Sequence, residues 1–385
     1  MSTQIIRRLV ISTVGTSLLT NQIDPKSKSQ SDWSSRLQDT ANRTEKQIEN
    51  GSDIDTIIKS LKQRAEKKLE KANTIEIKEA SAELNGIYGL YDDQIEQGIP
   101  DMHLLITTDT AQGRVAAEIV ESFLKTKGLT NISTYAPSGL STASSYLFVE
   151  GMAKLIPWMQ EIIKDYKNSR YTICFNLVGG FKALQGYLNT IGMFYADEII
   201  YVFEGSNKRI KIPKLPIKVD VSEIEPYQVQ LAMMDAGEIP ISWQEAQKVP
   251  KEWVYEIGQK IMLSAWGELL WDQCKEELLS KERPLPFPKL EYHQTFLDDY
   301  KAKPANEKII LQQNLARAAC LFKNHQDGIS AMKEDGIFRL RRYAGKHKDI
   351  DHFDLPKDRR VSCIAREGTL YLRHYGEHDY VNNNP

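Results

Sequence analysis

The fold of the first part of the chain is decided by the stretch Arg8-Leu-Val-Ile-Ser-Thr-Val-Gly-Thr-Ser-Leu-Leu19. Its apolar, largely β-branched residues predict a buried parallel strand, and Gly15 with the neighbouring hydroxyl residues predicts the loop at the carboxyl end of that strand. Residues 24–98 come next, and they are polar, rich in Lys and Glu, and helical in pattern. We therefore expect a helical insertion after the first strand, with breaks at Gly86 and Gly89.

Strand-like and helical segments alternate after this insertion. Apolar strand candidates lie at residues 103–108, 131–135, 171–177 and 198–203, and amphipathic helical patterns separate them. Strands joined through helices predict a parallel sheet, so residues 1–222 are expected to form an α/β domain. Pro157 falls inside a helical pattern and is expected to kink or divide that helix. Residues 210–222 have the pattern of a hairpin or linker that closes the domain.

The loops at the predicted strand ends carry the candidate ligand site, because ligands of open parallel sheets bind outside the carboxyl ends of the strands. Hydroxyls and backbone N–H groups at helix starts suit phosphate or ribose oxygens. The candidate residues are Gly15, Thr16, Ser17, Thr108, Asp109, Ser138, Gly139, Ser141, Asn176, Gly179, Gly180 and Lys182. The chain has neither a GxGxxG motif after the first strand nor a phosphate loop of the NTPases, which disfavours both of those classes. The alternative is that such loops merely cap helices, as in any α/β domain.

Charge is distributed unevenly along the chain. The whole chain has 50 Lys and Arg against 52 Asp and Glu, which excludes a uniformly basic nucleic-acid binder. Residues 220–282 hold 13 acidic and 5 basic residues, a net charge of -8, together with four of the six tryptophans. Residues 336–385 hold 10 basic and 7 acidic residues, a net of +3, with four of the seven histidines. This asymmetry indicates modules with different partners.

Residues 223–288 are expected to form an acidic helical middle domain that ends in a Pro-rich hinge. Apolar residues between 254 and 270 recur at helical spacing, which places Trp253 and Trp266 in a core rather than in a ligand site. The acidic balance repels RNA and favours a protein partner with a basic surface.

Residues 289–385 are expected to form an α+β domain, with a strand at 290–300, two helical stretches, and strands at 337–343, 360–365 and 369–375. RNA cleavage through the 2′-OH needs a base, an acid and cations around the phosphate. The residue pattern offers Arg339 and Arg341 for these roles, and further along the chain Arg359, Arg360, Arg373, His374, His378 and Tyr380. Arg339 and Arg341 would share one strand face. Glu377 and Asp379 are alternative candidates for the base. The opposing interpretation is that these residues form a solvated basic surface with a few histidines and have no catalytic role.

Three elements of residues 5–220 resemble the CARF domain of CRISPR-associated proteins. They are Gly15-Thr-Ser, Asn176-x-x-Gly-Gly-Phe-Lys182, and the closing Tyr201-x-Phe-Glu-Gly-Ser with Ile212-Pro-x-x-Pro216. Val178 stands where many members have Thr. The resemblance implies that residues 1–222 form a Rossmann-like CARF domain, and that two copies form a homodimer that binds a cyclic oligoadenylate across its two-fold axis, with cyclic tetra-adenylate as the expected ring. A symmetric polyanion fits a symmetric pair of loop sets.

Residues 289–385 resemble RelE-type toxins, which are ribosome-dependent mRNA interferases. The resemblance rests on the order of elements and on FRLRR, DRRV and LRHYGEHDYV. It implies that Arg339 and Arg341 are the paired basic residues, that Arg360 or the adjacent Arg359 binds the phosphate, and that the C-terminal His378 and Tyr380 supply acid–base and stacking groups. The RNA chemistry implied needs no metal or cofactor. A CARF module joined to a RelE module resembles the CRISPR-associated mRNA interferases.

The function expected from the sequence is therefore an mRNA endoribonuclease that cyclic oligoadenylate activates, that depends on the ribosome, and that inhibits translation in type III CRISPR antiviral signalling. Its expected partners are a second copy of the chain, the ribosome with its mRNA, and a ribosomal protein docked on the acidic middle domain. A cytoplasmic location is expected, because the sequence has neither a membrane-span candidate nor a secretory leader pattern. The alternatives are a CARF-containing transcriptional regulator with a nucleic-acid-binding tail, and a ring nuclease that degrades cyclic oligoadenylate.

Overall fold

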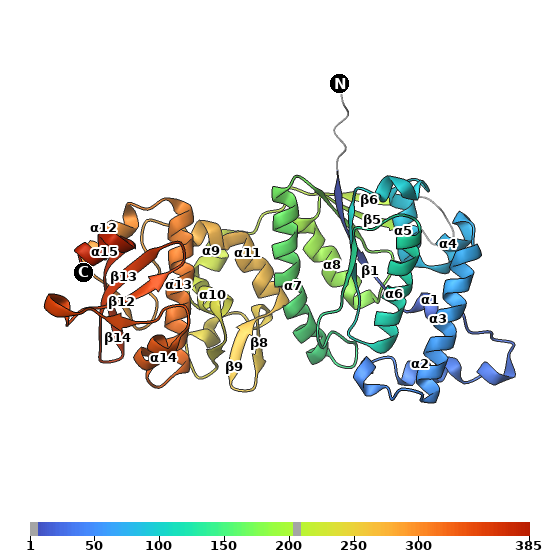
Figure 1. The fold of residues 1–385 in the computed structure, drawn as a ribbon, viewed down its shortest axis with the longest axis horizontal. Helices are drawn as coiled ribbons and strands as arrows, with labels where there is room; N and C mark the ends of the chain where they lie inside the picture. Colours follow the sequence, from blue (N-terminus) through green and yellow to red (C-terminus); the bar gives the residue numbers. More distant parts are fainter. Residues whose placement is uncertain (1–6, 203–208) are drawn as a thin grey trace, which may run out of the picture. The chain divides into compact units, whose positions relative to one another are not determined.

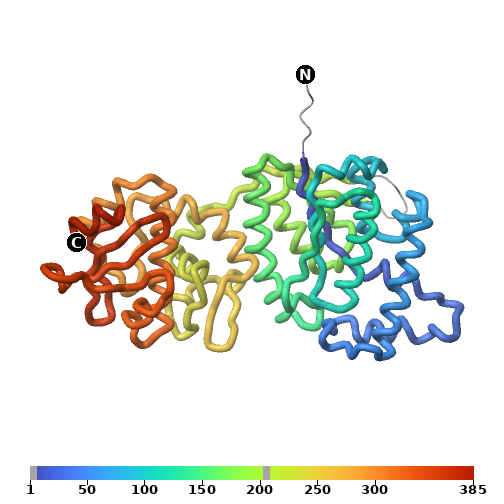
Figure 2. The backbone as a smooth tube through the Cα atoms, viewed as in Figure 1, coloured from blue at the N-terminus to red at the C-terminus, as the bar shows by residue number. Residues whose placement is uncertain are grey.

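The computed structural model describes residues 7–202 and 209–385. The chain divides into two compact units, Met1–Ile217 and Lys218–Pro385 (Figures 1 and 2). Both units combine helices with a sheet, so the protein is a multidomain chain of mixed α and β structure. Within the described ranges, no helix has both the length and the apolar character needed to cross a membrane.

The N-terminal unit is built on a six-stranded sheet in the order β3-β2-β1-β4-β5-β6. Its strands are β1 (Arg8–Thr13), β2 (Met102–Ile106), β3 (Ile132–Tyr135), β4 (Thr172–Asn176), β5 (Glu198–Val202) and β6 (Arg209–Pro213). The first five strands are parallel, and β6 returns antiparallel to β5 as the predicted closing hairpin. The strand order is compatible with the expected Rossmann-like arrangement. Phe203–Ser206 of the closing motif lie outside the described residues.

Helices cover both faces of this sheet, as the apolar character of β1 on both faces requires. Val10 points toward the core formed with the insertion and with α6 (Ala111–Thr126). On the other face lie α7 (Ser145–Asn168) and α8 (Lys182–Tyr195) (Figure 1). Pro157 lies inside the continuous helix α7, so the expected division of that helix does not occur.

The segment 24–98 is helical, as predicted. Its helices are α2 (Trp33–Asp39), α3 (Asp53–Lys71), α4 (Thr74–Ala80) and α5 (Ala82–Leu90), preceded by α1 (Ser17–Thr20). The hydroxyl of Ser52 caps α3 by accepting a hydrogen bond from the N–H of Asp55. Gly86 and Gly89 do not break a helix, because both lie within α5. Gly86 is required by close packing instead, since a Cβ at this position would overlap the side chain of Asn176.

The first part of the C-terminal unit is only partly helical, which corrects the prediction for residues 223–288. Helices α9 (Val221–Ile224), α10 (Gln228–Ala236) and α11 (Ala265–Leu279) are present. Between α10 and α11 lies a three-stranded antiparallel sheet formed by β7 (Ile239–Pro240), β8 (Val254–Ile257) and β9 (Lys260–Leu263). Gly258, with φ of +60°, forms the tight turn between β8 and β9. The apolar residues on either side of it, whose spacing also fits a helix, therefore pair as a hairpin.

A second sheet, of five strands, dominates the rest of this unit in the order β10-β14-β13-β12-β11. Its strands are β10 (Leu290–Tyr292), β11 (Arg341–Arg342), β12 (Asp351–Leu355), β13 (Arg359–Arg366) and β14 (Thr369–Glu377). The helices are α12 (Gln294–Lys301), α13 (Ala305–Asn324), α14 (Gly328–Glu334) and α15 (His378–Asn383). The β13–β14 hairpin is confirmed, whereas β12 was missed and the first strand ends at Tyr292 rather than Tyr300.

Residues 223–288 and 289–385, which were expected as separate domains, share one hydrophobic core. Trp271 and Leu278 of α11 belong to the same buried cluster as Leu315 of α13 and Phe353 of β12. This core covers one face of the five-stranded sheet. The opposite face carries the alternating polar residues of β12 and β13.

The N-terminal unit should lose stability as pH falls from about 6.5 to 4. His103 of β2 is fully buried, and burial lowers the pKa of its imidazole to about 4. The folded state therefore holds His103 neutral, whereas the unfolded chain binds a proton below its ordinary pKa of about 6.5, which costs roughly 3 kcal/mol by pH 4. Calorimetry of the whole chain should show this pH dependence, and His103→Gln should reduce it. An identical pH dependence in the variant would contradict this assignment.

Candidate functional site

A cavity of about 380 Å³ lies at the carboxyl edge of the N-terminal sheet. It is formed by the loops after β1, β2 and β4 together with the insertion, and it brings together half of the predicted ligand residues. These are Gly15, Thr16, Ser17, Thr108, Gly179 and Gly180. The lining also includes the hydroxyl side chains of Thr20, Thr110 and Thr142, the Asn42 amide and the Phe181 ring. None of the lining residues is charged. The cavity thus offers hydroxyls, a glycine-rich backbone and one aromatic ring to a polar ligand.

The two glycine loops are held rigidly against each other. Gly180 has φ of +93°, a conformation that favours glycine, and a Cβ there would lie 2.9 Å from the Cβ of Thr13. The Thr13 hydroxyl donates a hydrogen bond to the carbonyl of Gly179, and the side-chain amide of Gln185 donates to the same carbonyl at 2.8 Å. The loop after β4 is therefore fixed before any ligand arrives.

Glu83 of the insertion also reaches this edge, although the sequence analysis did not select it. The side chain is fully buried, and its Oε1 accepts a hydrogen bond from the N–H of Gly15 at 2.6 Å. Its Oε2 accepts from the Ser81 hydroxyl at 2.7 Å. Nothing in the residue pattern around Glu83 predicts its contact with Gly15, because the two residues are 68 positions apart in the sequence. Only the docking of α5 on the sheet places it there.

Asn176 is a structural residue of the edge rather than part of the cavity wall. It is fully buried, and its Nδ2 donates to the hydroxyl of Ser12 and to the carbonyl of Glu83, each at 3.1 Å. Lys182 is exposed at the first position of α8 and forms no hydrogen bond or ion pair with a described residue. At the two ends of the predicted NxxGGFK element, Asn176 is therefore buried and hydrogen-bonded, whereas Lys182 is open to solvent.

The remaining predicted ligand residues organise the loop after β3. Asp109 accepts hydrogen bonds from the guanidinium of Arg114 at 2.7 Å and from the N–H of Gly139 at 2.9 Å. The carbonyl of Ser138 accepts from Lys154, and Ser141 is buried. This loop reaches the cavity through Thr142 instead.

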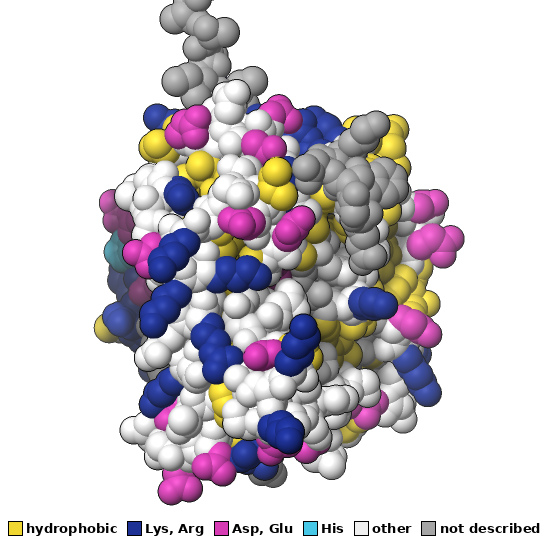
Figure 3. Space-filling view, turned by 90° about the vertical axis from the view of Figure 1, so that its right-hand side faces the viewer, with side chains coloured by type: hydrophobic (Ala, Val, Ile, Leu, Met, Phe, Trp, Pro, Cys, Tyr) yellow, Lys and Arg dark blue, Asp and Glu magenta, His cyan; other side chains and the backbone are white. Residues whose placement is uncertain are grey.

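The helical insertion supplies a wall of the cavity that the sequence analysis missed. Asn42 lines it, and its Oδ1 accepts hydrogen bonds from both the N–H and the hydroxyl of Thr142. Ala41 and Ala82 line it as well. Figure 3 views the unit from the side of the insertion, where Lys and Arg side chains are scattered among Asp and Glu.

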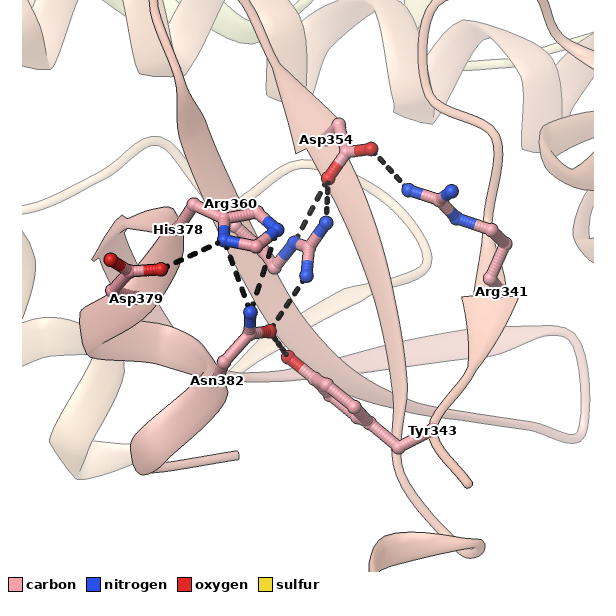
Figure 4. Close-up of polar contacts among 7 residues, drawn as sticks. All are labelled: Arg341, Tyr343, Asp354, Arg360, His378, Asp379 and Asn382. Atoms are coloured by element: carbon pink, nitrogen blue, oxygen red, sulfur yellow. Dashed lines mark hydrogen bonds and ion pairs between the residues drawn. The ribbon is translucent and has the colours of Figure 1, made fainter.

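The second cluster lies on the polar face of the five-stranded sheet (Figure 4). Asp354 of β12 stands between two arginines of neighbouring strands: its Oδ1 accepts from Nε and Nη2 of Arg360 at 2.9 and 2.7 Å, and its Oδ2 pairs with Arg341. The Arg360 side chain is only 8% exposed, whereas that of Arg341 is 50% exposed. Arg341 is therefore the accessible cation, and Arg360 is the buried one.

Helix α15 closes this cluster through Asn382. The Oδ1 of Asn382 accepts hydrogen bonds from Nη1 of Arg360 at 2.6 Å and from the Tyr343 hydroxyl at 2.9 Å. Its Nδ2 lies 3.1 Å from Nδ1 of His378, and that ring nitrogen lies 3.2 Å from a carboxylate oxygen of Asp379. Three predicted residues, Arg341, Arg360 and His378, thus belong to one polar network (Figure 4).

The structure does not bring Arg339 and Tyr380 into that network. Arg339 precedes β11 with φ of +48°, so it does not share a strand face with Arg341 as expected; its exposed side chain donates to the carbonyl of Gly336. The Tyr380 hydroxyl donates to Asp299 of α12 at 2.7 Å, and this bond raises the pKa of Tyr380 to about 12.

The alternative bases lie at the rim of the cluster. A carboxylate oxygen of Asp379 lies 3.2 Å from Nδ1 of His378, and Glu377 faces the guanidinium of Arg359 at 3.6 Å. Asp354 and Asn382, which complete the arginine network, were missed because β12 and α15 were not foreseen. Among the described residues, no group of three or more His, Cys, Asp or Glu side chains could hold a metal ion.

Residues 78–215 match the model of a protein family described as CRISPR-associated protein (Cas_APE2256). The matched segment runs from α4 to the end of the N-terminal unit, so it includes α5 and every strand of the sheet except β1. No curated protein matches the chain. Over these residues, which are less than half of the chain, the protein is similar to that CRISPR-associated family.

Asn176→Ala should destabilise the N-terminal unit by about 1–3 kcal/mol, because it leaves the buried carbonyl of Glu83 and the hydroxyl of Ser12 without their donor. Lys182→Ala is the matched control, since an exposed side chain without partners among the described residues should change stability by less than about 0.5 kcal/mol. Chemical denaturation of both variants measures the difference. Equal stability of the two variants would show that the Asn176 contacts do not hold the edge.

Proposed function

We propose that this protein is a ribosome-dependent mRNA endoribonuclease that a cyclic oligoadenylate activates, and that it inhibits translation in type III CRISPR antiviral signalling. The observation that carries the proposal is the union, in one chain, of a CRISPR-associated sensor-like segment with a separate arginine–histidine cluster. In this proposal the N-terminal unit is a CARF sensor domain and the end of the C-terminal unit is a RelE-like nuclease.

The cavity at the carboxyl edge of the sheet supports the sensor role. Its hydroxyls and glycine N–H groups suit the ribose and phosphate oxygens of an oligoadenylate, and the Phe181 ring can stack on an adenine. The lining is uncharged, so the nearby exposed Lys182 would supply the positive charge. Two copies related by a two-fold axis would offer two such cavities to one symmetric ring, with cyclic tetra-adenylate as the proposed activator.

The cluster on the second sheet supports the nuclease role. Arg341 keeps half of its side chain open to solvent and can bind the phosphate on either side of the scissile bond. His378 lies on the accessible rim and can donate a proton to the leaving 5′ oxygen. Arg360 would exchange Asn382 for a phosphate oxygen when RNA enters, because all its donor atoms are occupied in the free protein.

The charge balance of the cluster supports dependence on the ribosome. Asp354 neutralises one of the two arginine charges, so the site would attract free RNA weakly. A ribosome that presents the mRNA in one orientation would supply the alignment of the 2′-OH that the protein lacks. The position of the arginines on strands also disfavours the transcriptional-regulator alternative, in which a recognition helix would carry them.

The acidic part of the C-terminal unit is proposed to dock on a ribosomal protein. Glu223, Glu252, Glu256 and Glu277 are exposed on and around α9, β8 and α11. An acidic surface of this kind attracts a basic protein and repels the ribosomal RNA. It would therefore select protein rather than RNA on the ribosome surface.

Cyclic tetra-adenylate should stimulate cleavage of mRNA on programmed ribosomes, and naked RNA should be cut poorly. The products should carry 2′,3′-cyclic or 3′-phosphate ends, because the 2′-OH is the nucleophile. Arg341→Ala should lower the cleavage rate about 100-fold or more, with ribosome co-sedimentation unchanged. Arg366→Ala, which removes an exposed arginine of the β13–β14 turn, is the control. Metal-dependent cleavage of naked RNA leaving 3′-hydroxyls would refute the proposal, whereas ring opening without RNA cleavage would favour the ring nuclease.

Lys182→Ala should weaken activator binding by about 1–3 kcal/mol.

Reversal of the acidic surface should weaken ribosome association without affecting activator binding. The test variant carries Glu223→Lys, Glu252→Lys and Glu256→Lys, and its matched control carries the same change at exposed Glu49, Glu70 and Glu79 of the N-terminal unit. Co-sedimentation with ribosomes at two salt concentrations measures the effect, which should shrink at high salt. Undiminished association of the test variant would assign the acidic segment a purely structural role.

A further inference from the structure

His352 lies at the centre of the arginine–histidine cluster, although nothing above assigns it a role. It belongs to β12, opposite Arg341 of β11 and opposite Ser362 of β13 in the antiparallel ladder. Since side chains two residues apart share a strand face, His352 also lies on the same face as Asp354. The imidazole is 7% exposed, and the Tyr343 ring packs on it with a centroid distance of 4.2 Å.

Two polar atoms at this position have no hydrogen-bond partner within residues 7–202 and 209–385. They are the buried Nδ1 of His352 and the buried hydroxyl of Ser362, the residue directly opposite in the ladder. Buried polar atoms of folded proteins are nearly always paired, and an unpaired one destabilises the fold. Two such atoms side by side, beside two arginines, point to a polar group that binds here and is absent from the free chain.

The surrounding charges hold the imidazole neutral. Burial and the nearby guanidinium groups of Arg360 and Arg341 lower the pKa of His352 to about 4. The titratable and charged groups around it are Arg341, Tyr343, Asp354, Arg360 and His378. At neutral pH the ring therefore keeps a free lone pair and can accept a proton.

We propose that His352 is the proton acceptor of the RNA cleavage reaction, an inference that rests on the nuclease function proposed above. A ring nitrogen of His352 takes the proton of the 2′-OH, and the 2′ oxygen attacks the adjacent phosphorus. The bond from phosphorus to the 5′ oxygen breaks, and this oxygen receives a proton from His378. The products are a 2′,3′-cyclic phosphate and a 5′-hydroxyl, so protons and bonds balance. The two arginines hold the phosphate while charge develops on it.

RNA can reach His352 only if α15 moves away from the polar face of the sheet. The side-chain oxygen of Asn382 in this helix accepts hydrogen bonds from Nη1 of Arg360 and from the Tyr343 hydroxyl. Val381 of the same helix is fully buried. A phosphate oxygen can replace the Asn382 oxygen as the acceptor for both donors. Release of that contact also frees Tyr343, the side chain packed on the His352 ring.

The first arm of the test measures single-turnover cleavage by the full chain on programmed ribosomes with cyclic tetra-adenylate. His352→Asn should lower the rate about 10²–10⁴-fold, the usual range for loss of general acid–base catalysis. His347→Asn is the matched control, because His347 is an exposed histidine of the same unit. Circular dichroism and the thermal midpoint establish that each variant folds, and His352→Gln replaces the asparagine variant if that one does not.

The second arm separates a proton acceptor from a structural role. An mRNA with a sulfur in place of the scissile 5′ oxygen has a leaving group that needs no acid. His378→Asn should regain most of its rate on this substrate, whereas His352→Asn should stay slow. A His352 variant that is rescued as well, or one that cleaves the ordinary mRNA within threefold of wild type, would overturn the role of His352 while the proposed nuclease stands. If the wild-type chain cleaves no mRNA under these conditions, the proposed function fails, and the assignment of His352 fails with it.

Discussion

Buried polar groups must find hydrogen-bond partners, and this constraint shapes the candidate site of each unit. In the N-terminal unit the amide of Asn176 donates to the carbonyl of Glu83, and the carboxylate of Glu83 accepts from the N–H of Gly15. These bonds join the loop after β1, the end of β4 and helix α5. Gly86 lets α5 come close enough for them to form. The cavity for the proposed activator lies beside these three hydrogen-bonded segments.

The same constraint acts in the C-terminal unit, where the groups concerned are arginines. Burial of Arg360 is tolerated because Asp354 and Asn382 accept a hydrogen bond from each of the three nitrogens of its guanidinium. The arrangement stabilises the free protein and keeps a cation ready beside the more exposed Arg341. His352 and Ser362 differ from Arg360, since the Nδ1 of His352 and the hydroxyl of Ser362 are buried without a hydrogen-bond partner among the described residues.

The match of residues 78–215 to a CRISPR-associated family covers the N-terminal unit only. The C-terminal unit has to be interpreted from its own chemistry. Its five-stranded sheet and its acidic segment are built on one hydrophobic core that begins in α9. Because they share this core, the proposed docking surface and the proposed catalytic surface would keep a fixed distance from each other.

The sequence by itself determined the strands of the N-terminal unit, the helical insertion and the β13–β14 hairpin, because local apolar periodicity and turn residues specify these elements. It also predicted that Gly15, Thr16, Ser17 and the Gly179–Gly180 pair lie together at the carboxyl edge of the sheet, where they line one cavity, because loops at the ends of parallel strands meet at the same edge. It could not place β7, β8 and β9, whose apolar spacing also fits a helix until pairing across Gly258 decides. Nor could it find Glu83, Asn42, His352 or Asn382. Their importance comes from partners distant in sequence, and only packing of the insertion on the sheet edge and of α15 on the polar face brings those partners within hydrogen-bond reach.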